Sequence, residues 1–182
     1  MLTGEKVVLR DITEADVTDR YLGFLNDPQV TTFLTTKPSE HTIESLRKFV
    51  KEKIDSKDCI FLSITDKKSG LHIGNIKIEP IDYENKKAVI GIMIGDKEFL
   101  GKGYGTDAMK TALDYCFCDL NLNKVALGVV SENIAASKSY RKAGFIVEGV
   151  LREDTIWNGK KYDRTLMAVL KSEYKTRRKK NA

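Results

Sequence analysis

Apolar residues recur along this chain at two periods. Spacings of three and four residues predict amphipathic helices, and short apolar runs with period-two alternation predict strands. The expected strands begin at Val7 and cover 60–65, 72–79, 88–94, 125–130, 145–152 and 164–170. The expected helices cover roughly 13–26, 43–54, 103–120 and 133–143. This order of strands, helix, strand, helix and strands predicts an α/β (α+β) fold, with a mixed sheet and helices on its faces.

The charged residues divide the chain into a neutral body and a basic end. There are 182 residues, which suits one domain, with 31 Lys and Arg against 26 Asp and Glu. Residues 175–182 hold five basic residues and no acidic ones, so residues 1–174 are formally neutral. We expect a single domain over 1–174 and a frayed, solvated tail over 175–182. A tail that contacts RNA is the alternative.

Composition also excludes several classes of protein. No apolar run reaches 18 residues, and the first residues lack the order of a secretory signal. Cys116 and Cys118 lie two apart on an expected helix and point away from each other, so with Cys59 they are read as reduced thiols of a cytoplasmic protein. His41 and His72 are far apart and there is no Cys-x-x-Cys pair, so no metal site is expected.

A glycine-rich segment separates the strand 88–94 from the long helix that follows. Gly101, Gly103 and Gly105 alternate with Lys102 and Tyr104. Glycines let backbone N–H groups approach a ligand closely, and a helix N-terminus favours an anion such as diphosphate. The spacing does not match the phosphate loop of ATPases, and Thr106 replaces the third glycine of the dinucleotide fingerprint. A tight turn that needs small residues is the alternative.

A second motif follows the strand 125–130. Asn133 and Tyr140 are seven residues apart, about two helical turns, with Ala136 between them on the same face. The Asn amide can bind amide groups of a ligand, and the Tyr phenol can donate a proton. An N-capping Asn and a core Tyr are the structural alternatives.

Both motifs in this order resemble the GCN5-related N-acetyltransferase (GNAT) superfamily. The best match is the branch that acetylates N-termini of ribosomal proteins, with its spermidine and amino-sugar relatives. The resemblance spans nearly the whole chain, from 8–10 through 21–28 and 73–75 to 148–152. It implies a mostly antiparallel sheet of six to seven strands that is splayed at the cofactor site and flanked by about four helices.

The resemblance also implies acetyl-CoA as cofactor. The segment 92–94 would pair with the pantetheine arm, the loop 100–106 would hold the diphosphate, Asn133 would bind the pantetheine, and Lys142 would lie near the CoA phosphates. Leu100 replaces the family's usual Gln or Arg, so only its backbone is expected to contribute. The implied cofactor residues are Ile92, Met93, Ile94, Leu100, Gly101, Lys102, Gly103, Tyr104, Gly105, Thr106, Asn133, Ala136, Tyr140 and Lys142.

The resemblance implies acetyl transfer to a primary amine. Direct transfer is expected because Cys116 and Cys118 have no His nearby in the sequence to activate them. Tyr140 matches the position where the family often has a general acid. The oxyanion donor is expected to be a main-chain N–H near Met93. The expected proton acceptor is Glu79, with Asp82, Glu84 and a water relay as alternatives.

The acceptor is expected between the loop after the first helix and the last hairpin, where Asn26, Phe33, Tyr83 and Trp157 could line it. Trp157 could instead pack on a hairpin turn. Candidate acceptors are an amino sugar, a protein N-terminus, a polyamine or an aminoglycoside. No membrane or specific nucleic acid is expected as partner, and the sequence leaves a homodimer open. A non-catalytic CoA-binding sensor is the alternative function.

Overall fold

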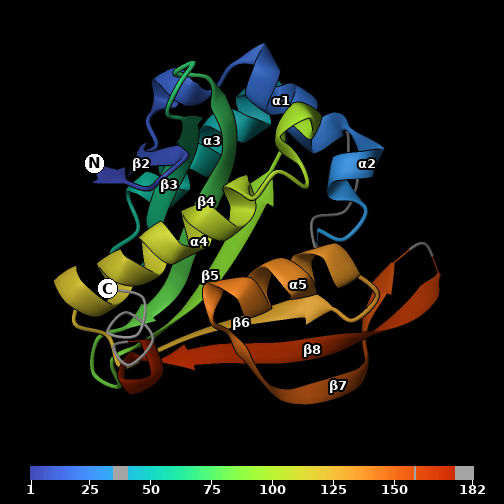
Figure 1. The fold of residues 1–182 in the computed structure, drawn as a ribbon. Helices are drawn as coiled ribbons and strands as arrows, with labels where there is room; N and C mark the ends of the chain where they lie inside the picture. Colours follow the sequence, from blue (N-terminus) through green and yellow to red (C-terminus); the bar gives the residue numbers. More distant parts are fainter. Residues whose placement is uncertain (35–40, 158, 175–182) are drawn as a thin grey trace.

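The computed structural model describes residues 1–34, 41–157 and 159–174. Their strands form one sheet in the order β1-β2-β3-β4-β5-β6-β8-β7 (Figure 1). All neighbouring strands are antiparallel except β5 and β6, which are parallel. The strands are β1 (Leu2–Thr3), β2 (Val7–Asp11), β3 (Ile60–Asp66), β4 (His72–Asp82), β5 (Lys87–Ile94), β6 (Lys124–Val130), β7 (Ile146–Trp157) and β8 (Lys160–Leu170).

Helices cover the sheet on both faces. Figure 1 shows α4 and α5 lying across one face. Buried side chains of α4 join the larger core cluster, whereas α1 and α3 join a separate smaller one. Phe61 belongs to the smaller cluster and its neighbour Leu62 to the larger, as expected for successive residues of a strand. The helices are α1 (Asp19–Asn26), α2 (Pro28–Thr31), α3 (Ile43–Ile54), α4 (Tyr104–Asp114) and α5 (Ile134–Ala143), with short 3-10 turns at Glu14–Asp16 and Lys97–Phe99.

The predicted mixed, mostly antiparallel sheet is confirmed, with differences in detail. The sheet has eight strands rather than six to seven, because a two-residue strand at Leu2–Thr3 pairs with β2. The helix expected from residue 13 is interrupted at Val17, and α1 begins after Thr18, whose hydroxyl accepts the Tyr21 N–H. The helix expected to reach residue 120 changes to a π-helical turn at Tyr115–Asp119.

The expected tail, 175–182, lies outside the described residues. In the part of the chain that is described, no helix is both long and apolar enough to cross a membrane.

Candidate functional site

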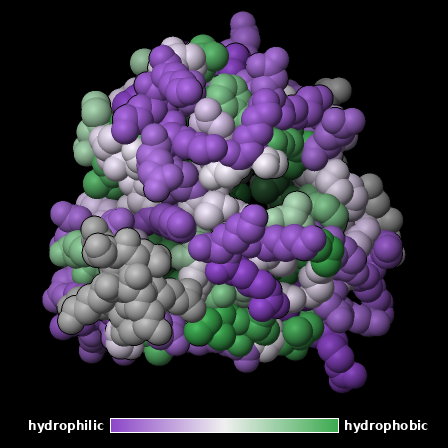
Figure 2. Space-filling model, in the orientation of Figure 1, coloured by the Kyte–Doolittle hydropathy of each residue, from purple (hydrophilic) through white to green (hydrophobic). Residues whose placement is uncertain are grey.

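The two parallel strands at the centre of the sheet separate from each other. β5 and β6 pair only from Lys87 to Val89, opposite Lys124 to Ala126. Both strands continue beyond this point, β5 to Ile94 and β6 to Val130, without pairing with each other. They therefore enclose an open wedge in the middle of the sheet. Figure 2 shows the molecule hollowed near the centre of this face, with apolar side chains inside the hollow.

Alternate peptide groups of β5 are available in this wedge. Gly95 donates its N–H to Ile73, which fixes the alternation of hydrogen-bonded pairs between β5 and β4. The backbone N–H and C=O of Met93, which lies opposite Asn75, are therefore directed at β4. The peptide groups of Ile92 and Ile94 face the wedge instead. The peptide groups of Ile92 and Ile94, on either side of Met93, are therefore the ones open to a ligand.

The glycine loop lies at the mouth of the wedge. Gly101 has φ +70° and Gly103, the N-cap of α4, has φ +88°. A Cβ added at Gly101 would meet no atom within 4 Å. These are left-handed conformations that favour glycine, and they leave the backbone open to a ligand. The loop therefore offers unobstructed peptide groups beside a helix N-terminus, which together suit an anion.

Two helices meet the wedge at Gly105. A Cβ at Gly105 would lie 3.6 Å from Ile94, 3.8 Å from Ser139 and 4.0 Å from Ile92. The first turn of α4 thus approaches both the end of β5 and α5. The hydroxyls of Thr106 and Ser139 are 2.8 Å apart and join α4 to α5 by a hydrogen bond. Ser139 was missed in the sequence, because nothing but its position beside Tyr140 marks it.

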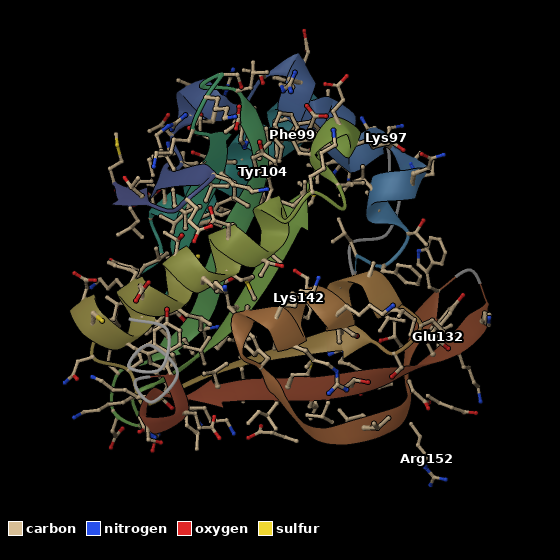
Figure 3. All side chains as sticks on the ribbon, viewed as in Figure 1. Lys97, Phe99, Tyr104, Glu132, Lys142 and Arg152 are labelled. Atoms are coloured by element: carbon tan, nitrogen blue, oxygen red, sulfur yellow. The ribbon has the colours of Figure 1, made fainter. Side chains whose placement is uncertain are left out.

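The side chain of Tyr104 is held by contacts within the protein. Its hydroxyl donates to Asp66 at 3.1 Å, and its ring packs edge-on to Phe99, with ring centroids 4.9 Å apart (Figure 3). The side chain of Tyr104 therefore supports the loop from the protein interior, and the backbone of Tyr104 is the part that could contact a cofactor. The side chain of Leu100 is 48% exposed.

The residues of the second motif lie on α5. Asn133 accepts the Ala136 N–H at 3.1 Å, so it does cap the helix, and its side-chain NH₂ is the group that could bind pantetheine. Ala136 and Tyr140 pack against the larger core cluster, and Tyr140 meets Phe145 with centroids 6.0 Å apart. Burial raises the pKa of Tyr140 to about 12, so its phenol stays protonated at neutral pH. Lys142 projects from the same helix (Figure 3).

Glu79 is poorly suited to the proton-acceptor role expected of it. Its carboxylate forms ion pairs with Lys53 at 2.5 Å and Lys77 at 2.7 Å. Partial burial raises the pKa of Glu79, but hydrogen bonds from the two lysines outweigh burial and lower the pKa below its usual value. A carboxylate stabilised in this way is a weak base.

Two of the four expected acceptor residues come together. Phe33 and Trp157 line one small cavity of about 10 Å³ with Tyr162, Val130 and Thr155. The indole N–H of Trp157 is buried and has no hydrogen-bond partner among the described residues. Tyr162 was missed in the sequence, and only its cross-strand position near the hairpin end could have indicated it.

The other two acceptor residues do not join this cavity. The side-chain amide of Asn26 donates to the backbone carbonyl of His41 and accepts the His41 N–H, both at 3.0 Å. It therefore ties the end of α1 to the segment that leads into α3. Tyr83 is 56% exposed in the turn between β4 and β5, at the end where β5 and β6 are still paired. Across the described residues, no group of three His, Cys, Asp or Glu is arranged to hold a metal ion.

Comparison with known proteins places these features in a family. Residues 6–146 match the acetyltransferase (GNAT) domain. The chain is 32% identical to the spermidine N(1)-acetyltransferase of Escherichia coli K12 over 175 residues, covering 96% of this chain and 91% of that protein. It is 30% identical over 181 residues to the uncharacterized N-acetyltransferase p20 of Bacillus licheniformis, covering 95% and 97% of the two chains.

The fold is shared with a solved structure of the same kind. The spermidine N-acetyltransferase of Vibrio cholerae, crystallised in complex with CoA and spermine, superposes with a TM-score of 0.85. The two chains are 28% identical, and the match covers 93% of this chain and 98% of that one.

Proposed function

Because the chain belongs to the GNAT acetyltransferase family and is an N-acetyltransferase that uses acetyl-CoA, we propose that acetyl-CoA binds in the wedge between β5 and β6. We further propose that the acetyl group passes directly from the cofactor to a primary amine. The observation that carries this proposal is the end of strand pairing at Val89, with the glycine loop at the mouth of the opening. An extended arm fits the unpaired edge of β5 as an added strand would.

The residues of the wedge fit the cofactor in charge and shape. The N–H groups of the loop 101–105 and the first turn of α4 suit the diphosphate. The peptide groups of Ile92 and Ile94 suit the amides of the arm, and Asn133 can donate a further hydrogen bond. When bound, acetyl-CoA supplies a thioester carbonyl for attack by the amine.

Tyr140 is proposed to hold the proton needed by the departing sulfur. Its phenol is protonated at neutral pH because burial raises its pKa to about 12. It can therefore donate a hydrogen bond, and then a proton, where a thiolate develops. The phenol recovers a proton from the nitrogen of the new amide, so that the reaction yields one amide and one thiol.

The amine must be neutral before it attacks. An alkyl ammonium has a pKa of about 10.4, so most of it is protonated at pH 7. Since Lys53 and Lys77 both pair with Glu79, we propose that water, rather than this carboxylate, takes the proton. Partial desolvation of the ammonium in the acceptor site would lower its pKa in the same direction.

For the acceptor we propose a polyamine. The support is the likeness to spermidine acetyltransferases and the three aromatic side chains of the cavity, Phe33, Trp157 and Tyr162. Aromatic faces bind ammonium groups by cation–π attraction, which contributes about 2 kcal/mol when the site is desolvated. The cavity would have to widen to admit the chain of a polyamine.

Release of CoA thiol from acetyl-CoA tests this proposal. The panel contains spermidine, an amino sugar, a peptide with a free N-terminus and an aminoglycoside, with the product mass measured for each. We expect spermidine to give the highest kcat/KM, by about tenfold or more. A higher value with another amine would overturn the polyamine assignment and leave acetyl transfer standing. Tight CoA binding without turnover of any amine would instead favour the sensor alternative.

A further inference from the structure

The turn between β1 and β2 is held against the cofactor helix. The carboxylate of Asp107 in α4 accepts three consecutive backbone N–H groups, from Glu5 at 3.1 Å, Lys6 at 2.8 Å and Val7 at 3.1 Å. A Cβ on Gly4 would lie 2.6 Å from both Asp107 and Thr111, so the turn sits directly on the helix. The backbone of Lys6 is thereby fixed relative to α4.

The side chain of Lys6 then reaches the glycine loop. Its ammonium nitrogen donates to the carbonyl oxygen of Lys102 at 2.7 Å and lies 5.4 Å from the centroid of the Tyr104 ring. It would be 3.7 Å from a Cβ on Gly103. Tyr104 is itself held by Asp66 and Phe99, so the surface that supports Lys6 is fixed as well.

The charge of Lys6 is not neutralised by a protein carboxylate. Among the described residues, no Asp or Glu lies within ion-pair distance of its ammonium nitrogen. This is unlike Lys53, Lys77, Lys97 and Lys124, which each pair with an acid. An ammonium has three N–H donors, and the carbonyl of Lys102 accepts one of them. The ammonium of Lys6 thus keeps at least one N–H that can donate to an anion bound on the loop.

We propose that Lys6 is a phosphate ligand of CoA, supplied from the β1–β2 turn across the loop 101–103. This inference rests on the proposed place of the diphosphate. It assigns a phosphate-binding cation to a residue 96 positions away in sequence from Lys102. Lys6 binds the nucleotide end of the cofactor and touches no reacting atom, so it contributes to affinity and not to the chemical step.

The test compares two acetyl donors with and without the lysine. Lys6→Met keeps an unbranched stem that can pack on Tyr104 and removes the charge. S-acetyl-pantetheine carries the same thioester as acetyl-CoA and lacks the diphosphate. We expect Lys6→Met to raise KM for acetyl-CoA about tenfold, because a hydrogen bond to a charged group is lost. The KM for S-acetyl-pantetheine and both kcat values are expected to stay within about twofold of the unsubstituted protein.

Lys67→Met is the matched control. Lys67 donates to the carbonyl of Gly4 at 3.1 Å, so it supports the same turn, and within the described part of the chain no hydrogen bond or ion pair joins its ammonium to the loop. We expect it to leave KM unchanged for both donors. An unchanged KM for acetyl-CoA in Lys6→Met would overturn the inference, and so would an equal rise with both donors. If the unsubstituted protein used both donors with the same KM, the proposed diphosphate site would fail instead.

Discussion

Tyr140→Phe is expected to lower kcat by about 10²–10³-fold while KM for acetyl-CoA changes by less than about threefold. The substitution keeps the ring that packs against Phe145 and removes the hydroxyl alone. Its effect therefore reports the loss of a donor to the departing sulfur, and not a change in packing. Steady-state kinetics with saturating amine measures both parameters.

The pH profile gives a second readout for Tyr140. The phenol is protonated below its pKa of about 12, which burial has raised from 10. We therefore expect the rate to rise with pH as the amine loses its proton, without a falling limb from Tyr140 up to about pH 10. A falling limb between pH 8 and 10 that disappears in Tyr140→Phe would contradict the raised pKa.

Tyr115→Phe is a suitable control for this variant. Tyr115 is partly buried against the same core cluster, and burial raises its pKa too, but it lies on the π-helical turn after α4. We expect its kcat to match that of the unsubstituted protein. Equal kcat values for Tyr140→Phe and Tyr115→Phe would remove the proton-donor role.

Gly101→Val is expected to weaken CoA binding by about a hundredfold or more. Gly101 has φ +70°, which a β-branched residue cannot adopt without strain, so the loop must change its backbone. The peptide N–H groups then no longer converge on the diphosphate. Losing two hydrogen bonds to a charged group, at ~1.5–3 kcal/mol each, accounts for this magnitude. Calorimetric titration with CoA measures it.

Gly70→Val carries the same backbone strain away from the wedge. Gly70 has φ +72° in the turn between β3 and β4, and a Cβ there would also meet no atom within 4 Å. Both variants should lose similar stability in thermal unfolding, whereas only Gly101→Val should lose CoA affinity. Equal CoA affinity in the two variants would mean that the loop does not hold the diphosphate.

The fold was largely predictable because its signals are local and periodic. Strand and helix periodicity indicated the mixed sheet, and the positive φ of Gly101 and Gly103 agrees with the role expected of glycine in the loop. The strand at Leu2–Thr3 could not be predicted, because two residues carry no period. The break at Val17 was hidden because the capping box of Thr13 and Asp16 begins a short 3-10 turn, Glu14–Asp16, instead of a long helix.

The site was less predictable, because side-chain partners come from distant parts of the chain. Glu79 looked available in the sequence, yet Lys53 of α3 and Lys77 of β4 both reach it. Tyr104 lies within the loop motif, but its hydroxyl is bonded to Asp66, 38 positions earlier. Lys6 precedes the first long strand and carries no motif, and only the fold brings it to Lys102.

The proposed place of the cofactor can be tested by a crystal structure of this chain grown with CoA. We expect the diphosphate to lie on the N–H groups of 101–105 and the arm to run along Ile92 and Ile94, between β5 and β6. A cofactor bound outside this wedge, with β5 and β6 unchanged and the loop peptides turned away from phosphate, would contradict it.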